Sequence, residues 1–354
     1  MPGIANKYFR PGPPLFSVSH MTSARYALGV FASPGATPSD AFTGLVRGEE
    51  VRDVSALGGV NDLLADWDDA GRRLAELAAQ DTGPWARLAE LDVRCPVAPR
   101  QILQCGANYR SHVVGIVMAE RRADESTTGH NSDVPEPEVR AWAEAMMDNR
   151  VITGSPYVFA GLPSALCGPY DDVVLPGRGA NHDWELELAA VIGKPARGLT
   201  RQNALDYVAG YTICNDITTR SLVYRPDLKA IGTDWFAAKN APTFLPTGPF
   251  LVPAPVAGPP ARMRITLRHN GITRQDESCA DMLFDLPAIL AYITSVTELS
   301  PGDLVLTGSP AGNGAHWGVY LAEGDLIEGE ISGLGRQRNR CVRITSHPSA
   351  KERS

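Results

Sequence analysis

The stretch DWELELAAVIG, residues 183–193, carries two glutamates, Glu185 and Glu187, inside an apolar run. The run predicts a strand, and because side chains alternate along a strand, the two carboxylates point to the same face. Like charges on one face of a largely buried strand repel each other, and each resists the loss of water. A bound cation resolves both problems, so the stretch indicates a metal site on a buried sheet.

A third carboxylate extends this set. Asp216 follows a second apolar run, YVAGYTICN at residues 207–215, which also predicts a strand. Carboxylate oxygens are hard ligands, and three of them suit magnesium, manganese or calcium better than zinc. We therefore predict that Glu185, Glu187 and Asp216 bind Mg2+ or Mn2+, with Ca2+ as a substitute ion.

The composition limits the classes of function. The chain has 354 residues, of which 44% are hydrophobic and 21% charged, as in an ordinary globular protein. A net charge of -7 without a basic stripe argues against nucleic acid as a partner. The sequence shows neither an apolar run long enough for a membrane span nor the apolar segment of a secretory signal in residues 1–20. Six scattered cysteines are typical of reduced thiols, so we expect a cytoplasmic protein.

The chain divides into a small front unit and a large remainder. Residues 1–20 are rich in proline and glycine and predict a loose arm, and residues 21–95 predict a small N-terminal domain. The Pro-Val-Ala-Pro link at residues 96–99 opens a catalytic domain that we expect to span residues 96–345. Residues 346–354 are the expected C-terminal tail.

Short strands dominate the pattern of the large unit. Runs of apolar residues bounded by Gly, Pro and Asp predict strands, and helical spacing is rarer. This pattern suits a rolled or barrel-like sheet better than a doubly wound one, so the predicted fold class is α+β, mostly β. Strands are expected at residues 25–31, 43–47, 101–105, 173–175, 184–192, 208–214, 263–269, 304–307 and 326–331, and helices at 68–79 and 286–294.

Residues 116–150 interrupt the strand pattern and predict an insertion. A charged, polar stretch over residues 118–133 predicts a long loop, and residues 137–149 predict a short helix with Pro137 in its first turn. Long structured loops are often lids. We therefore expect the insertion to become ordered over the site when a ligand binds.

Four further motifs accompany the carboxylates in the large unit. They are GANYRSH at 106–112, NDITTR at 215–220, DWFAAK at 234–239 and PGDLVLTGSPAGNG at 301–314. In this order, across residues 101–340, they resemble the fumarylacetoacetate hydrolase superfamily. The resemblance implies a catalytic domain of rolled, mixed β-sheet, a magnesium or manganese ion on the three carboxylates, and a homodimer. The substrates that it implies are small 2-oxo acids, often acylpyruvates.

The motifs also supply candidate residues around a 2-oxo acid. A neutral imidazole at His112 could take a proton from water, because the ordinary histidine pKa is about 6.5. Lys239 and Arg220 could bind the substrate carboxylate or a developing oxyanion. The motif at 301–314 predicts a strand that enters a glycine-rich turn. Ser309, with the backbone amides of this glycine-rich turn, could hold the carboxylate end of the substrate. The other predicted substrate-binding residues are Tyr109 and His316.

We therefore predict a divalent-metal-dependent hydrolase that cleaves a carbon–carbon bond in an acylpyruvate-like 2,4-dioxo acid. The cation would stabilise the enolate that forms when this bond breaks. His112 would activate the attacking water, and Lys239 would stabilise the leaving pyruvate enolate. A non-catalytic member of the superfamily that binds metal or ligand is a hypothesis from a different class.

Two positions depart from the pattern of the superfamily. Hydrolytic members usually carry a glutamate three residues after the motif histidine, where this chain has Gly115, and often a glutamine where it has Val223. The first departure favours an alternative enzyme, a 2-oxo acid decarboxylase or a hydratase/isomerase, which needs less from a histidine–glutamate pair. The candidates to replace the missing carboxylate are Glu120, Glu136, Glu138 and His316.

Overall fold

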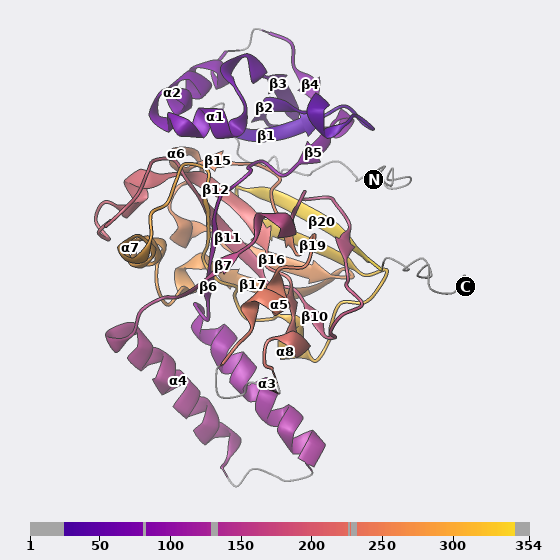
Figure 1. Cartoon of the computed structure of the whole chain (residues 1–354), viewed down its shortest axis with the longest axis vertical. Coiled ribbons are helices and arrows are strands. Elements are labelled where there is room, and N and C mark those ends of the chain that lie inside the picture. The colour runs from indigo at the N-terminus through magenta and orange to yellow at the C-terminus, as the bar shows by residue number, and fades with distance from the viewer. Residues whose placement is uncertain (1–24, 81–82, 129–133, 226, 228–231, 344–354) are drawn as a thin grey trace, which may run out of the picture.

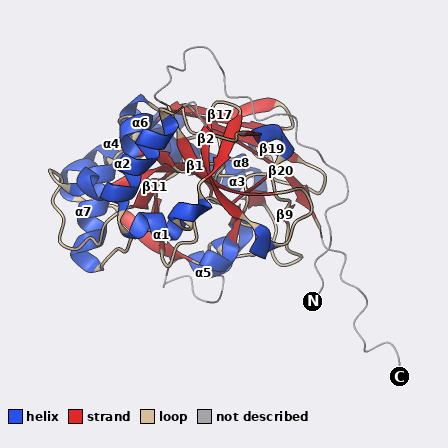
Figure 2. Ribbon diagram, turned by 90° about the horizontal axis from the view of Figure 1, so that it is seen from above, coloured by secondary structure: helices blue, strands red, loops and turns tan. Residues whose placement is uncertain are grey.

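The structure is a computed structural model that describes residues 25–80, 83–128, 134–225, 227 and 232–343. Figure 1 shows three regions along its long axis: a small unit of sheet and helices, a central body of β-sheets, and a pair of helices that extends from the far end. Seen along that axis, strands gather in the centre and most helices lie around them (Figure 2). The predicted N-terminal arm and C-terminal tail lie outside the described residues.

The small unit is a five-stranded antiparallel sheet in the order β4-β3-β2-β1-β5, with two helices packed on it. The longer helix buries Trp67, Ala70, Leu74 and Ala78, which recur every three or four residues and so form one stripe toward the sheet. The bounds are β1 Ala27–Ala32, β2 Phe42–Arg47, β3 Glu50–Asp53, α1 Val60–Ala65, α2 Trp67–Ala78, β4 Ala86–Arg87 and β5 Asp92–Arg94.

The small unit is joined to the body by backbone hydrogen bonds as well as by apolar packing. Leu28 and Leu251 exchange two of them, with N···O distances of 2.9 and 2.8 Å. The rings of Phe31 and Phe250 lie 6.2 Å apart between their centroids. The two units therefore share one continuous interior.

The body contains two larger mixed sheets. One has the order β15-β12-β11-β18-β6-β7 and the other β17-β16-β19-β20-β9. The pairs β18–β6 and β20–β9 are parallel and the remaining neighbours antiparallel. The bounds are β6 Ile102–Gly106, β7 Tyr157–Gly161, β9 Val173–Val174, β11 Leu186–Ile192, β12 Val208–Asn215, β15 Val252–Pro253, β16 Arg264–His269, β17 Ile272–Ser278, β18 Leu304–Leu306, β19 Leu326–Ile331 and β20 Gly335–Val342.

Shorter elements complete the body. Strands β10 and β13 pair with each other, as do β14 and β8, and α7 covers the apolar residues of the sheets with its own buried face. The bounds are β8 Leu166–Cys167, β10 His182–Asp183, β13 Thr218–Thr219, α5 Trp235–Lys239, β14 Leu245–Pro246, α6 Ala254–Ala257, α7 Leu286–Val296 and α8 Gly314–Trp317. The mixed, curled sheets confirm the predicted α+β, mostly β fold class. None of the described helices is long and apolar enough to cross a membrane.

The core is divided by strand β11, which is buried along its whole length. Leu186, Leu188, Ala190 and Ile192 belong to the main cluster between the two sheets. The alternate residues Ala189 and Val191 belong to a second cluster that includes Leu28, Leu45 and Leu74 of the small unit. Because both faces of β11 are covered, its sequence is almost continuously apolar, and a charged residue within it is exceptional.

The pair of helices corrects one prediction. Helix α3 spans Arg110–Thr128 and α4 spans Glu136–Thr153, so the predicted loop over residues 118–133 is wrong for residues 118–128. Residues 129–133 lie outside the described part. The polar stretch is rich in Ala, Glu and Arg, which are strong helix formers. The two helices bury Val114, Met118 and Ala143 in a small cluster of their own, and this packing stabilises a helix whose sequence is largely polar.

The turn after β18 depends on a glycine. Gly312 has a φ of +94°, and a Cβ atom there would lie 1.9 Å from the carbonyl oxygen of Arg274 in β17. We expect Gly312→Ala to lower the free energy of unfolding by about 3 kcal/mol or more, since strain and a backbone clash combine. Chemical denaturation measures this loss.

The matched control is Gly324→Ala. Gly324 has a similar φ of +92°, but a Cβ there would meet nothing within 4 Å. This variant should lose about 1 to 2 kcal/mol, which is the cost of the left-handed conformation alone. Equal losses in the two variants would contradict the assigned clash.

Candidate metal and active site

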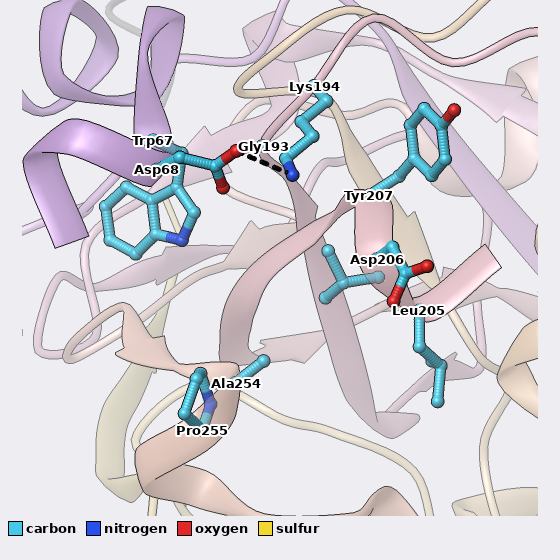
Figure 3. A pocket seen from close by; sticks show the side chains of 10 residues that line it. Trp67, Asp68, Gly193, Lys194, Leu205, Asp206, Tyr207, Ala254 and Pro255 are labelled. Carbon is cyan, nitrogen blue, oxygen red and sulfur yellow. Dashed lines mark ion pairs between the residues drawn. The ribbon is translucent and has the colours of Figure 1, made fainter. Parts of the chain in front are cut away.

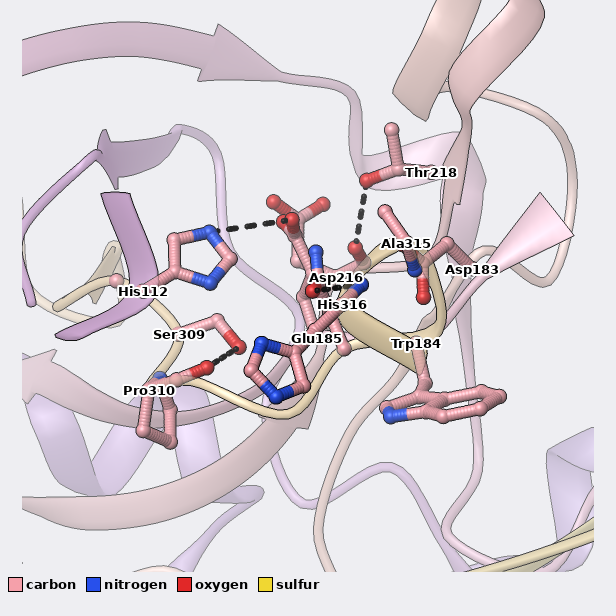
Figure 4. Close-up of polar contacts among 12 residues, drawn as sticks. His112, Asp183, Trp184, Glu185, Asp216, Thr218, Ser309, Pro310, Ala315 and His316 are labelled. Carbon is pink, nitrogen blue, oxygen red and sulfur yellow. Dashed lines mark hydrogen bonds and ion pairs between the residues drawn. The ribbon is translucent and has the colours of Figure 1, made fainter. Parts of the chain in front are cut away.

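Three carboxylates meet because β11 and β12 form an antiparallel pair. Leu186 lies opposite Asn215, so the beginning of β11 lies beside the end of β12. The amide of Asp216 donates to the Glu185 carbonyl at 2.8 Å. Carboxylate oxygens from Glu185, Glu187 and Asp216, one from each residue, lie within 4.8 Å of one another. The structure thus brings together the three residues predicted as metal ligands, and Figure 4 shows two of them, Glu185 and Asp216.

The glutamates point to one face of the sheet, as the alternation along the strand requires. Glu187 shares the face of Ala189 and Val191, which is the face turned away from the main core cluster. Glu185 precedes the first residue of β11 and is held by its amide, which donates to Asn215 Oδ1 at 2.9 Å. The exposed fractions of Glu185, Glu187 and Asp216 are 6%, 2% and 1%. Water therefore contributes little to stabilising these charges.

Neighbouring strands fix the carboxylates with groups that the sequence analysis missed. Gly308, just after β18, donates its amide to Glu187 Oε2 at 2.7 Å. Gln104 of β6 donates from Nε2 to Asp216 Oδ1 at 2.9 Å. For Gln104, the sequence signal was a polar amide side chain inside a predicted apolar strand, because a buried polar group of this kind requires a hydrogen-bond partner.

Lys239 lies between two of the carboxylates. It ends helix α5, whose first turn is capped by Asp234, and its Nζ donates to Glu185 Oε2 at 2.6 Å and to Asp216 Oδ2. The rings of Phe159 and Trp235 each have their centroid 5.6 Å from the same Nζ, a cation–π geometry. Burial lowers the pKa of Lys239, but Asp216 and Glu185 more than compensate, so its pKa is raised and it stays charged.

Arg220 bridges two acidic residues. Its Nε donates to Asp183 Oδ2 at 2.7 Å, and one terminal nitrogen donates to Glu185 Oε1 at 2.5 Å. Asp183 also accepts the backbone amides of Gly314 and Ala315 at the start of α8. The guanidinium thereby connects the metal-ligand candidates to the glycine-rich turn.

The charges in this centre do not balance. Asp183, Glu185, Glu187 and Asp216 are buried acids, and the cations in contact with them are the buried Lys239 and the partly buried Arg220. Two negative charges are left over when all four acids ionise. A hard divalent cation supplies the missing two charges, and the donor set is the oxygen set that Mg2+ and Mn2+ prefer. The residues therefore fit the metal that the sequence predicts.

The pKa values follow from the same imbalance. Burial, and then Asp216, raise the pKa of Glu187 well above its usual value. Burial is also the largest cause that raises the pKa of Asp216 to about 6. For Glu185, burial acts in the same direction, but Lys239 and Arg220 outweigh it, and the pKa falls below its usual range. The shortage of positive charge is thus concentrated on Glu187 and Asp216.

His112 lies in the first turn of α3, where it faces the carboxylates. Its Nε2 is 3.9 Å from Glu185 Oε1, and the residue is 6% exposed. Burial, with smaller effects of Arg220 and Lys239, lowers the pKa of His112 to about 4. The imidazole is therefore neutral near neutral pH and can accept a proton. Its Nδ1 is buried and has no hydrogen-bond partner among the described residues.

The other predicted substrate-binding residues lie in different surroundings. Ser309 is buried, and its Oγ accepts a hydrogen bond from Gln275 Nε2 at 2.9 Å. Tyr109 is fully buried in the main core cluster, and burial raises the pKa of its hydroxyl well above the usual value. Glu136 and Glu138 are exposed in the first turn of α4, and the side chain of Glu120 lies outside the described part.

A cleft of about 500 Å3 opens between the helix pair and the glycine-rich turn. Its lining combines charged and polar side chains with apolar ones, and helix α3 contributes both kinds. The lining residues include Ser111, Gly115, Met118, Arg140, Glu277 and His316. Since His112 belongs to the same helix turn as Ser111, this cleft is the candidate approach for a substrate.

A smaller pocket of about 250 Å3 lies between the small unit and the far end of β11. Its wall includes Trp67 and Tyr207, and an ion pair of 2.8 Å joins Lys194 and Asp68 across it (Figure 3). None of the predicted site residues lines it. We therefore assign no part of the chemistry to this pocket.

Comparison with known proteins places the chain among relatives of fumarylacetoacetate hydrolase. The family model for the C-terminal domain of fumarylacetoacetate (FAA) hydrolase matches residues 101–342. A 2,4-didehydro-3-deoxy-L-rhamnonate hydrolase of Sphingomonas sp. (strain SKA58) is 37% identical over 55% of this chain and 67% of its own length. The mitochondrial oxaloacetate tautomerase FAHD2B of Homo sapiens is 35% identical over 55% of this chain, and the match spans 61% of that relative.

A solved structure is similar over a longer stretch. The maleylpyruvate hydrolase of Sphingobium sp. SYK-6, in complex with manganese (II) ion and pyruvate, has a TM-score of 0.65 and 27% sequence identity. The similarity covers 90% of this chain and 99% of that one. The front unit is therefore within the compared region, although the family model begins at residue 101.

Loss of one ligand should abolish the response to metal. In Glu187→Gln the amide oxygen can still accept from Gly308, so we expect metal-free Tm to change little. Magnesium at about 100 times its Kd should stabilise the unaltered chain by about 2.7 kcal/mol, or roughly 3 to 5 °C in Tm for a chain of this length. The variant should lose this increase. Differential scanning calorimetry with magnesium and with EDTA measures both.

The control for this experiment is Glu323→Gln, on an exposed turn. It should retain the full increase in Tm. A Glu187→Gln variant that keeps the increase would contradict the assignment of Glu187 as a ligand.

Removal of the internal cation should destabilise the metal-free protein. Lys239→Met leaves Glu185 and Asp216 without their shared ammonium group, and breaking one side of a buried ion pair costs about 3 to 5 kcal/mol. Saturating magnesium should restore part of the loss, because a bound ion would bring positive charge to the same carboxylate residues. Chemical denaturation with and without EDTA checks this.

Lys194→Met is the matched control, because Lys194 pairs with Asp68 at the surface. Its effect should stay below about 1 kcal/mol. If Lys239→Met cost as little as Lys194→Met, the charge balance described above would be wrong.

Proposed function

The chain belongs to the fumarylacetoacetate hydrolase family, and we propose that it hydrolyses a carbon–carbon bond in an acylpyruvate-like 2,4-dioxo acid with a divalent metal ion. The observation that carries this proposal is the set of Glu185, Glu187 and Asp216 with the neutral imidazole of His112 beside it. A maleylpyruvate hydrolase solved with manganese and pyruvate supports both the metal and the class of product.

In this proposal the three carboxylates hold Mg2+ or Mn2+. When bound, such an ion supplies a Lewis acid that stabilises the negative charge developing on the oxygens of a 2-oxo acid. Gln104 and Gly308 keep Asp216 and Glu187 in place through their hydrogen bonds. The chain therefore provides a pre-arranged oxygen set, so little rearrangement is required of it.

His112 is the proposed general base. Hydrolysis adds the hydroxyl group of water to the distal carbonyl carbon and a proton to the carbon that leaves. Nε2 of His112 can accept the proton from water because the ring is neutral. Glu185, at 3.9 Å, stabilises the positive charge that the ring then carries.

The buried cations and the glycine-rich turn orient the substrate. Lys239 and Arg220 keep their charges and, together with a bound divalent ion, would offset the four acids, so an anionic substrate would meet a centre without net negative charge. Ser309 is held by Gln275 in the turn after β18, where its hydroxyl can contact the carboxylate end. We propose a small 2-oxo acid as the substrate class for this reason.

A second candidate function uses the same centre without attack by water. Gly115 supplies no carboxylate beside His112, and the human relative at 35% identity is an oxaloacetate tautomerase. Tautomerisation, isomerisation or decarboxylation of a 2-oxo acid needs proton transfer at one carbon, which a single neutral histidine can perform. The homodimer and the closure of the helix pair over a ligand stay predictions.

Product-resolved NMR separates these functions. We expect acetylpyruvate to give acetate plus pyruvate with magnesium and to stay unchanged with EDTA. Faster exchange between the keto and enol forms of oxaloacetate, without acetate from acetylpyruvate, would favour the tautomerase. Release of pyruvate from oxaloacetate above the metal-only blank would favour the decarboxylase.

His112→Asn is the variant that links the activity to the site. It should lower kcat by about 100-fold or more, the usual contribution of a general base. The magnesium-induced increase in Tm should remain, because His112 is not among the proposed ligands. A variant with full kcat would remove His112 from the mechanism.

A further inference from the structure

Gly115 leaves a space on α3 that another residue fills. It lies three residues after His112, one helical turn further along α3 and on the same side. An ideal Cβ at position 115 would lie 2.9 Å from Nδ1 of His316, closer than real contacts of a Cβ allow. A side chain at 115 and the present position of His316 therefore exclude each other.

Neighbouring residues of the same turn hold His316 in this position. It belongs to α8, where its backbone amide donates to the Asn313 cap at 3.2 Å. Its ring lies edge-on to the ring of Trp317, with 4.8 Å between the centroids. Nε1 of Trp317 in turn donates a hydrogen bond to the Gly312 carbonyl at 3.1 Å. These contacts orient the imidazole toward α3, and such support from neighbouring groups is what a functional side chain requires.

His112 and His316 belong to the same small region. Helices α3 and α8 are in contact, His316 lines the cleft, and Figure 4 shows both imidazole rings beside Ser309 and Glu185. His316 is also among the groups whose charge acts on His112. The buried Nδ1 of His112 lacks a hydrogen-bond partner among the described residues. His316 therefore lines the cleft, and the buried His112 lies on the same helix one turn before the glycine that His316 approaches.

We propose that Gly115 and His316 form a matched pair, in which the glycine admits the imidazole and His316 positions the reacting water or substrate oxygen against His112. This inference rests on the proposed function, since it concerns the same cleft. In this proposal, His316 contacts the reacting oxygen, and Gly115 leaves room for the imidazole ring of His316. It also explains how the centre works without a carboxylate at position 115.

A double-mutant cycle tests the pair. Gly115→Ala puts a methyl group where His316 lies, and His316→Ala removes the ring. Each single variant should lower kcat about 10-fold to 100-fold, as small displacements in active sites do, with a smaller change in KM. The double variant should lose no more than the larger single loss, because both changes remove one arrangement. Additive losses, or a His316→Ala variant with unchanged kcat, would overturn the inference.

Two further variants of His316 separate positioning from packing. His316→Asn keeps a polar atom near the position of Nδ1, and His316→Leu keeps an apolar bulk of similar size. Positioning predicts that Asn retains more of kcat than Leu, while simple packing predicts the reverse. Gly177→Ala is the control substitution, since an added Cβ there meets nothing within 4 Å, and it should leave kcat unchanged.

A readout without turnover keeps the inference separate from the proposed function. In metal-free protein labelled at histidine, the ring resonance of His112, assigned with His112→Asn, should shift in Gly115→Ala and in His316→Ala. Unchanged resonances would overturn the pair whatever the activity. If these shifts occur but neither acetylpyruvate nor oxaloacetate is converted, the proposed function fails and the pair stands. If conversion is normal in both single variants, the pair fails and the function stands.

Discussion

The rest of the structure depends on the buried carboxylate centre, where acidic side chains outnumber basic ones and water has little access. Four buried acids surround two cations, and the backbone of β11 and β12 holds the acids so that they cannot separate. A protein keeps such an arrangement at a cost in stability, because buried charges are stable only when paired. Lys239, Arg220 and the amide of Gly308 offset part of that cost. The remainder explains why the centre suits a divalent ion.

The neighbouring elements follow from this constraint. Strand β18 must end beside Glu187 so that Gly308 can donate to it, and β6 must lie next to β18 so that Gln104 reaches Asp216. Helix α5 carries Lys239 to Glu185 and to the other carboxylate oxygen of Asp216. The small N-terminal unit covers the face of β11 that bears Ala189 and Val191, and so helps to exclude water from the glutamates' side of the sheet. Each element contributes one contact, and together they give the centre its geometry.

Much of this was readable from sequence where the signal is local. Alternation along residues 183–193 was enough to place Glu185 and Glu187 on one face, and the ordered motifs were enough to identify the family. Position 115 shows the limit, because the sequence records a missing side chain, whereas the approach of His316 joins two positions that lie 201 residues apart in the chain. The predicted loop failed for a similar reason. A polar segment becomes a helix through its packing on α4, and pattern analysis of one segment does not include its partner.

The proposed base and the proposed metal ligands belong to different parts of the fold. The ligands belong to the sheets, whereas His112 belongs to a helix that packs with α4 around its own small apolar cluster and extends away from the sheets in Figure 1. Local opening of such a satellite cluster costs less free energy than global unfolding. The 3.9 Å between His112 Nε2 and Glu185 Oε1 therefore joins two separately packed parts of the fold. If His112 is the base, substitutions at the remote ends of the helix pair would alter its placement while the three carboxylates stay as they are.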